Sequence, residues 1–233
     1  DAVNSFYKVI IRLTEWIIQT APLGVLALMA EMIAKLGITA IKSLAFYMIC
    51  VIIGLLIQFF IISPLLLKAI SKYSPVLLFK HMFLALTTVF STASSSATLP
   101  VTMSCLKKNV KVSNRVTSFV ASLGTTLNMD GTAIYQVISV IFLAQFYNIE
   151  LTFSQLLLIT ITTIFASMGT AGIPSSGLFT LVIILNSVNV PLEGIGMIMA
   201  VDRVLDMCRS TVNIWGDSCS AVIIASIEGE NFE

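Results

Sequence analysis

The chain has 233 residues, of which 57% are hydrophobic and only 11% charged, and its formal net charge is +1. So few polar residues cannot cover a water-soluble globule of this size, and we expect most of the chain to lie in a membrane. The sequence has no basic run with interleaved aromatic residues, which excludes a nucleic-acid-binding protein. Because it begins at Asp1 without a signal-like segment, it is typical of a fragment or a processed product.

Two long apolar stretches open the chain. A hydrocarbon core of about 30 Å needs about 20 apolar residues in one helix. We expect a first helix near residues 6–34, bent at Pro22. A second helix is expected near residues 41–67.

The pattern changes over residues 79–106, where two apolar arms flank a serine-rich centre. Neither arm is expected to be long enough to cross a membrane alone, so the segment is interpreted as a re-entrant hairpin. Ser94 to Ser96 followed by Pro100 resembles a helix N-cap with proline near the first helical position, whose free N–H groups would point at an anion. The alternative is a plain serine-rich linker.

A third long helix is predicted over residues 116–146, interrupted at residues 128–132. This interruption holds Asn128 and Asp130, and Gly131 could allow unwinding that exposes carbonyl oxygens. A simple kink is the alternative, although a carboxylate at membrane depth argues against it.

Residues 153–187 repeat the pattern of residues 79–106, with two short apolar arms on either side of the glycine-rich residues 169–177. This centre is expected to be a flexible tip and a candidate gate. A last helix is predicted over residues 194–227.

The basic residues predict how these segments are oriented. Of the 13 Lys and Arg, seven flank the first interrupted segment and none lies between residues 116 and 201. If that segment enters and leaves on one side, the positive-inside rule makes this side cytoplasmic, and the second segment then enters from outside. Two opposed hairpins form an inverted repeat, in which binding sites lie near the midplane. The alternative is two kinked but ordinary spanning helices.

The last helix carries one polar stripe on an otherwise apolar surface. At about 100° per residue, its five polar positions fall within roughly 80° of arc. Ionisable groups inside a membrane normally line a pathway or pair with one another. One alternative is a structural ladder, in which Asp202, Asp206 and Arg209 only pair with one another at helical spacing. However, the stripe has three carboxylates and one guanidinium, and the excess negative charge favours binding of a hard cation such as Na⁺. The stripe consists of Asp202, Asp206, Arg209, Asn213 and Asp217.

Other reactive residue types give no sign of an enzyme. The single histidine, His81, lies at a predicted membrane boundary, and no second histidine is present to act as a base beside a serine. The four cysteines lie in apolar segments without a Cys-x-x-Cys pair and are interpreted as small buried hydrophobic residues. They are Cys50, Cys105, Cys208 and Cys219.

Four motifs together resemble the dicarboxylate/amino acid:cation symporter family, which includes the excitatory amino acid transporters. They follow one another in the family's order over nearly the whole chain, at residues 94–100, 128–132, 169–174 and 206–217. The resemblance implies a glutamate-transporter-like, all-α membrane fold. Residues 1–40 would be a scaffold-type helix and residues 41–233 a transport domain with two opposed re-entrant hairpins.

The resemblance also implies the activity and its partners. We expect sodium-coupled symport of L-aspartate or L-glutamate by alternating access, in a multi-pass protein of the plasma or inner membrane that is a homotrimer when intact and contacts membrane lipid. The cofactor is Na⁺.

By motif position, Arg209 resembles the clamp for the substrate's side-chain carboxylate, which a planar guanidinium can bind with two hydrogen bonds. The remaining expected substrate residues are Ser95, Ser96, Thr132, Ile173, Gly177, Asp206, Ser210 and Asn213. The expected sodium residues are Gly124, Thr126, Asn128, Met129, Asp130, Ser167, Met168, Thr170, Asn213 and Asp217.

The sequence departs from the family's pattern in three respects. Family members often carry a further arginine where this chain has Ala93 or Met207, and Arg203 is a candidate substitute. Gln136 stands where the animal glutamate transporters have a proton-carrying glutamate, so proton cotransport through that site is not expected. The family's first four helices are absent from this sequence.

The alternatives within transport are a proton-coupled dicarboxylate carrier and a neutral amino acid carrier of the same fold. An ion channel would need a continuous polar pore, and a membrane enzyme would need a base. The sequence does not distinguish aspartate from glutamate.

Overall fold

The computed structural model describes residues 38–170 and 172–230. Nearer the N-terminus it describes six single residues, namely Arg12, Leu23, Leu26, Ala27, Ala30 and Ala34. Apart from these positions, the helix predicted over residues 6–34 lies outside the described residues. Every regular element in the described ranges is a helix, and these ranges contain no strand. The all-α fold class is therefore confirmed for this part of the chain.

The predicted second helix is one continuous helical segment that contains a π-helical turn. It begins as α2 (Ile38–Ile57), passes through the π-helical turn η1 (Gln58–Ile62) and ends as α3 (Ser63–Ile70). This segment, from Ile38 to Ile70, is a few residues longer than the predicted range of 41–67.

The first helical pair consists of α4 (Pro75–Thr92) and α5 (Ser95–Cys105), which pack against each other. Pro75 is the first residue of α4, a position at which its missing N–H removes no hydrogen bond. The prediction that this arm starts at residue 79 was wrong. With 18 residues, α4 is long and apolar enough to cross a membrane, so the expectation that neither arm could cross alone was wrong for this arm. The arm is longer than expected because it starts at Pro75.

A short turn joins α4 to α5. Ala93 ends α4 in the left-handed conformation (φ 50°), and the Ser94 side chain caps α5 by accepting a hydrogen bond from the Ala97 N–H. The predicted N-cap is thus present, but the prediction of proline near the first position was wrong, because α5 begins at Ser95 and Pro100 lies inside it. Ser94 to Ser96 form a cap and a first turn rather than a linker. A π-helical turn, η2 (Leu106–Val110), ends the pair.

The third predicted helix is broken as expected but over fewer residues. The helix α6 (Asn114–Leu127) is followed by α7 (Asp130–Phe146), and only Asn128 and Met129 are non-helical between them. Gly131 is helical, so it does not serve to unwind the chain. A Cβ there would overlap the backbone of Arg209, which shows that glycine is needed for close packing of α7 on α10.

The second helical pair consists of α8 (Phe153–Met168) and α9 (Ser176–Ser187), which also pack together. A capping box of Thr152 and Gln155 starts α8. The predicted tip of residues 169–177 is shorter than expected, because Ser176 and Gly177 already belong to α9. After the short η3 (Leu192–Gly194), the last helix is α10 (Ile195–Ile227), within one residue of the predicted start.

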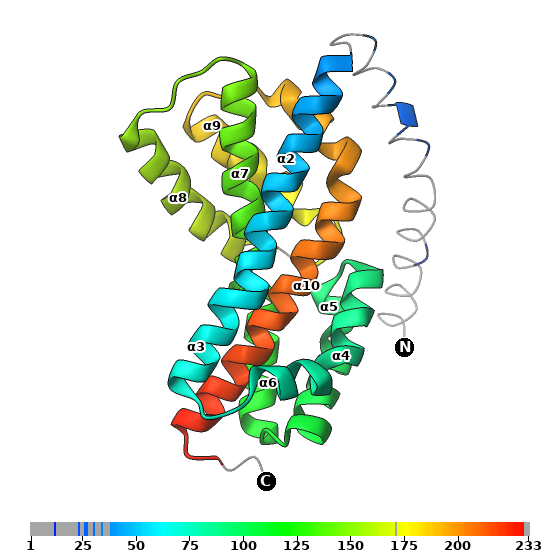
Figure 1. Ribbon diagram of the computed structural model, residues 1–233, viewed down its shortest axis with the longest axis vertical. Helices are drawn as coiled ribbons and strands as arrows, with labels where there is room; N and C mark the ends of the chain where they lie inside the picture. Colours follow the sequence, from blue (N-terminus) through cyan, green and yellow to red (C-terminus); the bar gives the residue numbers. More distant parts are fainter. Residues whose placement is uncertain are drawn as a thin grey trace, which may run out of the picture.

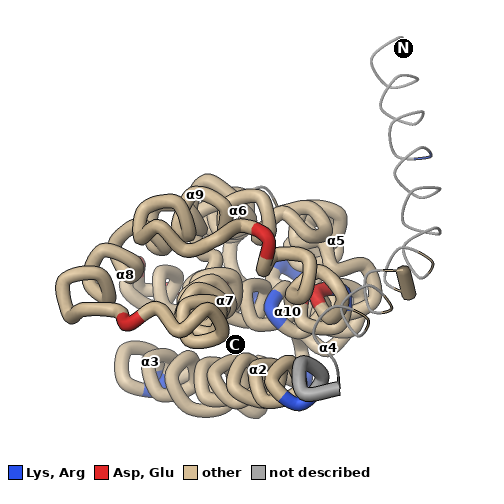
Figure 2. Tube along the Cα trace, turned by 90° about the horizontal axis from the view of Figure 1, so that it is seen from above, with Lys and Arg blue, Asp and Glu red and all other residues tan. Residues whose placement is uncertain are grey.

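The long helix α10 is the axis of the molecule and is packed by α2, α3, α4, α6 and α7 (Figure 1). Seen along the long axis, α2 and α3 form one flank, α7 and α10 lie in the middle, and α5, α6 and α9 form the other flank (Figure 2). The N-terminal half of α10 packs into one hydrophobic core through Leu205 and Val212, and its C-terminal half packs into a second through Ile214 and Trp215. Asn213 therefore lies where the two cores meet.

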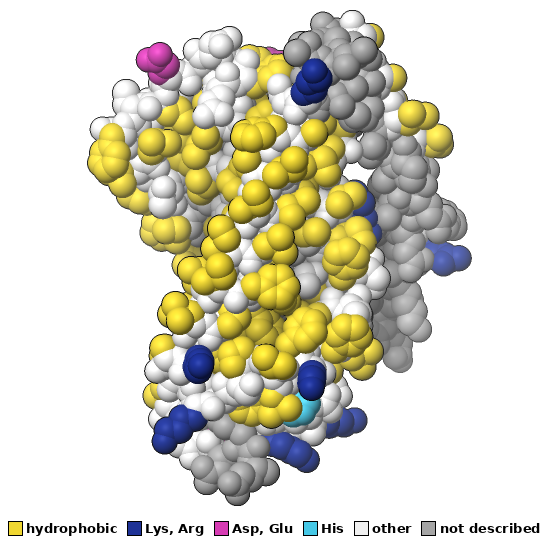
Figure 3. Space-filling view, in the orientation of Figure 1, with side chains coloured by type: hydrophobic (Ala, Val, Ile, Leu, Met, Phe, Trp, Pro, Cys, Tyr) yellow, Lys and Arg dark blue, Asp and Glu magenta, His cyan; other side chains and the backbone are white. Residues whose placement is uncertain are grey.

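The outer surface suits a membrane. Apolar side chains cover most of the face in Figure 3, while basic side chains and His81 gather at the end where α3 and α4 meet. Among the described residues, three helical segments are able to cross a membrane by length and composition: Lys42–Ile70, Pro75–Thr92 and Asn114–Phe146. Two of the cysteines, Cys105 and Cys219, are buried as predicted, whereas Cys50 and Cys208 are only half-buried because they lie nearer this surface.

Candidate functional site

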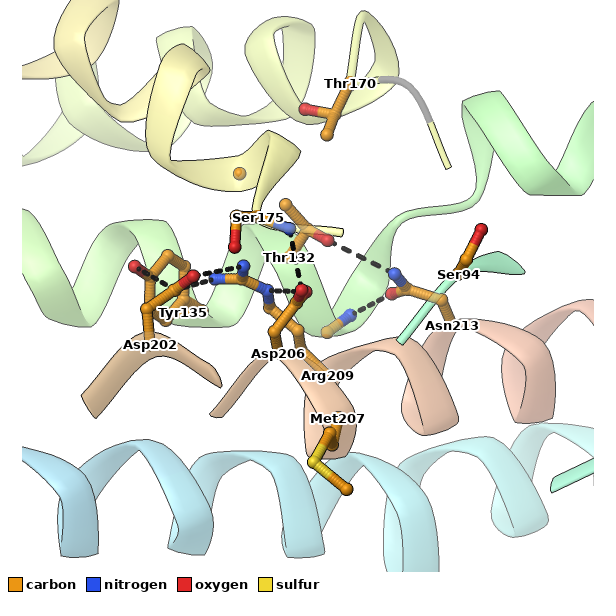
Figure 4. Close-up of polar contacts among 12 residues, drawn as sticks. Ser94, Thr132, Tyr135, Thr170, Ser175, Asp202, Asp206, Met207, Arg209 and Asn213 are labelled. Atoms are coloured by element: carbon orange, nitrogen blue, oxygen red, sulfur yellow. Dashed lines mark hydrogen bonds and ion pairs between the residues drawn. The ribbon is translucent and has the colours of Figure 1, made fainter. Parts of the chain in front are cut away.

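The buried guanidinium of Arg209 is the centre of a charged cluster on α10. Its side chain is 1% exposed. Nε donates a hydrogen bond of 2.8 Å to Asp206 Oδ1, and NH1 forms an ion pair of 3.0 Å with Asp202 Oδ1 (Figure 4). Two carboxylates thus surround one guanidinium, which is the pairing that the structural-ladder alternative expected, and the cluster keeps a formal charge of −1.

Tyr135 of α7 completes the cluster from the opposite side. Arg209 Cζ lies 4.0 Å from the centroid of the Tyr135 ring, at cation–π distance. The Tyr135 hydroxyl donates to Asp202 Oδ1, the oxygen that pairs with Arg209 (2.9 Å). Tyr135 was not among the residues expected from the sequence. Its position three residues after Thr132, on the same face of α7, was the available signal.

Asp206 connects α10 to the segment between α8 and α9. Its second oxygen, Oδ2, accepts a hydrogen bond of 2.7 Å from the backbone N–H of Ser175 (Figure 4). Ser175 has a left-handed backbone (φ 58°), a conformation that costs energy for a residue with a side chain. This contact depends on how the segment turns, which no pattern in the sequence indicates.

A small cavity of about 10 Å³ lies beside the cluster, roughly the space of one water molecule. Seven of the nine expected substrate residues line it: Ser95, Thr132, Ile173, Asp206, Arg209, Ser210 and Asn213. Met129, Gly172 and Ser176 complete the lining. The cavity is too small for an amino acid in this arrangement.

The two remaining expected residues lie just outside the cavity wall. Ser96 is exposed. A Cβ at Gly177 would lie 3.3 Å from the Arg209 guanidinium, so this glycine packs directly against it.

The connections of the two helical pairs meet over this cavity. The Gly172 carbonyl accepts two hydrogen bonds from the first pair, one from Ser94 Oγ (2.8 Å) and one from the Ser96 N–H (3.0 Å). A Cβ at Gly172 would lie 2.6 Å from Ser96 Oγ, so only glycine fits without displacement. Segments separated by more than 70 residues in the sequence are therefore in direct contact.

Asn213 joins α10 to the break before α7. Its Oδ1 accepts from the Gly131 N–H (2.8 Å), and its Nδ2 donates to Thr132 Oγ1 (3.2 Å) and to Met129 Sδ (3.1 Å). Thr132, Met129 and Asn213 therefore form one buried network at the cavity wall.

One turn further along α10, Asp217 and Asn128 form a second polar group. Asn128 Nδ2 donates to Asp217 Oδ1 (2.9 Å), while Asp217 Oδ2 is buried and has no hydrogen-bond partner in the described part of the chain. A Cβ at Gly124 would overlap the Asp217 carboxylate. The sequence expectation that Gly124, Asn128 and Asp217 lie together agrees with this arrangement.

Asp130 lies beside this group. A Cβ at Gly216 would be 3.0 Å from Asp130 Oδ2 and 3.1 Å from Asn128 Nδ2, so both side chains reach the backbone of α10. Gln58 Nε2 donates to Asp130 Oδ2 (3.0 Å). Gln58 was not among the residues expected from the sequence, although a single amide inside an apolar span is itself a signal of a polar site.

The donor set around Asp217 fits a single hard cation. It offers two carboxylates and an amide, and one carboxylate oxygen lacks a partner although it is buried, which is costly without a positive charge nearby. The described residues hold no group of three or more His, Cys, Asp or Glu that could bind a metal ion. The low number of acidic ligands suits a monovalent ion better than a divalent one.

Four other expected sodium residues show no common site. The hydroxyls of Thr126, Ser167 and Thr170 donate to carbonyls three or four residues earlier in the chain, at Leu123, Ile164 and Ala166 respectively. Met168 is exposed. Thr126 lies on α6 and Ser167 on α8, and these two helices contact each other, whereas Thr170 follows the end of α8.

Gln136 holds the second helical pair to α7. It is fully buried, and its Nε2 donates to the Gly177 carbonyl and to Thr180 Oγ1. The amide thus fixes the start of α9, which carries part of the cavity wall.

Comparison with known proteins gives a consistent result. The sequence pattern described as "Sodium:dicarboxylate symporter family" matches residues 1–227. The chain is 46% identical over 226 residues to excitatory amino acid transporter 1 of Ambystoma tigrinum, covering 96% of this chain and 42% of that protein. It is 44% identical to the human excitatory amino acid transporter 1 over 223 residues, covering 95% and 41%. For an excitatory amino acid transporter of Caenorhabditis elegans the identity is 39% over 219 residues, covering 93% and 44%. The chain thus spans less than half the length of the curated relatives it matches.

Proposed function

Because the chain belongs to the sodium:dicarboxylate symporter family, we propose that it forms the substrate-carrying part of a sodium-coupled transporter for L-aspartate or L-glutamate. The observation that carries this proposal is the buried Arg209 guanidinium on the wall of a cavity between the two helical pairs. A guanidinium in a low-dielectric site binds a carboxylate with two parallel hydrogen bonds, and an acidic amino acid has a second carboxylate to offer.

The proposed substrate roles are those that the family resemblance implies, and the lining of the cavity by seven of the nine residues supports them. Arg209 binds the side-chain carboxylate, for which it exchanges its contacts with Asp202 and Asp206. Asp206 and Thr132 lie near the substrate's amino and carboxylate groups. The remaining substrate residues, close to the main-chain carboxylate, are Ser95, Ser96, Ile173, Gly177, Ser210 and Asn213.

Entry of an amino acid requires the cavity to open. Residues 169–175, together with the first turn of α9, act as the gate in this proposal. The contacts that must separate are Ser175 with Asp206 and Gly172 with Ser94 and Ser96, because they hold the two helical pairs together over the cavity.

Sodium is the proposed coupling ion. Asn128, Asp130, Asn213 and Asp217 form the first group of ligands, with the Gly124 backbone beside them. The second group consists of Thr126, Met129, Ser167, Met168 and Thr170. A bound sodium ion supplies the positive charge that offsets buried carboxylates. The first group has the stronger support, because the buried Oδ2 of Asp217 has no hydrogen-bond partner among the described residues. The hydroxyls of Ser167 and Thr170 in the second group already donate to backbone carbonyls.

We also propose a membrane topology and an oligomeric state for the protein. The two helical pairs are re-entrant hairpins of opposite entry that form an inverted repeat, with residues 1–40 as a scaffold helix and residues 41–233 as the transport domain. The intact protein is a homotrimer in the plasma or inner membrane, spans it several times, and contacts lipid through its apolar surface.

Uptake by the intact protein in liposomes tests the function. An inward sodium gradient should drive accumulation of labelled aspartate, and replacement of sodium by choline should abolish it. Uptake that follows a proton gradient, or that prefers serine over aspartate, would instead identify one of the two alternative carriers.

A further inference from the structure

Gln58 is the only amide side chain in the apolar segment Lys42–Ile70. A polar side chain at membrane depth is costly unless it finds a partner, so its contacts indicate what it does. Its Nε2 donates to Asp130 Oδ2 at 3.0 Å, and Ser63 Oγ lies at 3.5 Å.

The π-helical turn η1 begins at Gln58 and sets the direction of this side chain. In a π-helix the N–H of one residue bonds to the carbonyl five residues earlier, as Ser63 does to Gln58. Pro64 follows and has no N–H, so the carbonyl of Phe59 loses its donor in this register. Such turns are frequent at functional sites.

Trp215 of α10 supplies the missing donor. Its Nε1–H donates to the Phe59 carbonyl (2.9 Å), and its ring stacks on the Phe59 ring with centroids 5.2 Å apart. Trp215 is 2% exposed. The turn is therefore fixed to α10 two residues before Asp217.

Asp130 is held between these two elements. Gly216, next to Trp215, leaves room for Asp130 Oδ2, which at the same time accepts the hydrogen bond from Gln58. Asn128, whose Nδ2 also lies against Gly216, connects this point to Asp217. The arrangement joins η1, α7 and α10 at the donor set described above.

We propose that Gln58 is a positioning residue for sodium binding: its amide N–H holds one oxygen of Asp130 and so fixes the orientation in which the carboxylate is offered to the ion. This adds the π-helical turn η1 to the ion site. The polar stripe of α10 and the break before α7 had indicated only residues of those two segments. The inference rests on the sodium coupling of the proposed function.

Thermal unfolding of the intact protein at increasing NaCl, with choline chloride keeping the ionic strength constant, tests the proposal. The readout is the sodium concentration that gives half of the maximal rise in melting temperature, which needs no transport activity. Gln58→Leu removes the amide with little change in volume and should raise this concentration at least about threefold. Its melting temperature without sodium serves only as the baseline of each titration, because loss of the donor to Asp130 Oδ2 is costly while removal of a polar group from an apolar span is favourable. Gln145→Leu, at an exposed amide of α7, is the matched control and should change nothing.

A double-mutant cycle tests whether Gln58 affects sodium binding through Asp130 or only through the general stability of the protein. In an Asp130→Asn background, Gln58→Leu should add no further shift, because the group through which it acts has been changed. If Gln58→Leu does not fold, Trp215→Phe keeps the ring but removes the donor to Phe59, and it should shift the sodium midpoint in the same direction.

The outcomes are distinguishable. An unchanged sodium midpoint in Gln58→Leu and Trp215→Phe, or the same shift with and without Asp130, would overturn the role of Gln58 while leaving the proposed function intact. A parent protein that sodium does not stabilise at all would overturn both.

Discussion

The Arg209 guanidinium lies 4.0 Å from the centre of the Tyr135 ring, and the Tyr135 hydroxyl donates to the same Asp202 oxygen that pairs with Arg209. The tyrosine therefore moderates how strongly Asp202 holds the guanidinium. In the proposed function Arg209 exchanges this partner for a substrate carboxylate, so the hydroxyl should affect substrate affinity without touching the substrate.

Tyr135→Phe should weaken aspartate binding roughly tenfold. Asp202 would lose a donor and hold Arg209 more tightly, and a hydrogen bond to a charged group contributes about 1.5 kcal/mol or more, where 1.4 kcal/mol is a factor of ten. Calorimetric titration in saturating sodium measures this. Tyr73→Phe is the control, since it removes a tyrosine hydroxyl that bonds His81, outside the cluster, and should leave affinity within about twofold. Equal losses in both variants would mean that Tyr135 only supports the fold.

Gly172→Ala should separate the two connections over the cavity. The new methyl group would lie 2.6 Å from Ser96 Oγ and 3.0 Å from the Thr125 carbonyl, and overpacking of this kind typically costs about 1–3 kcal/mol. We expect faster release of bound aspartate and an affinity reduced at least about fivefold, both measurable by dilution of labelled ligand. Gly169→Ala offers a control in the same segment, because its methyl group meets only ordinary contacts at 3.7 Å and beyond. Unchanged release from Gly172→Ala would argue against this contact as part of the gate.

Asp217→Asn should flatten the dependence of aspartate affinity on sodium. Two ligands that bind cooperatively strengthen each other by the same factor, so loss of a sodium ligand appears in the aspartate titration. The variant keeps the shape of the side chain and removes a buried charge whose Oδ2 lacks a partner, so its melting temperature without sodium should not fall. If its affinity curve against sodium overlays that of the parent, Asp217 is not a sodium ligand.

The sequence predicted the local features of this fold better than the contacts between distant segments. The face shared by Asp202, Asp206 and Arg209 follows from helical spacing alone, and the break near Asn128 follows from its polar residues. Helix starts were less predictable: Pro75 begins α4 earlier than hydropathy indicated, and the Ser94 cap moves Pro100 into the interior of α5.

Contacts such as Tyr135 with Arg209, Ser175 with Asp206 and Gln58 with Asp130 were out of reach of such reasoning. They join residues 31 to 74 positions apart, and they depend on a left-handed residue, a π-helical turn and the packing of α7 on α10. None of these leaves a periodic pattern in one sequence.

Competition binding with Arg209→Cys in saturating sodium tests the central claim, that a buried guanidinium recognises the acidic side chain of the substrate. Removing one partner of a buried charged pair leaves the other unpaired, so aspartate should bind at least about tenfold more weakly, while serine or alanine should bind as well as before or better. Equal losses for acidic and neutral amino acids would contradict the account, because Arg209 would then serve only to hold Asp202 and Asp206 in the fold.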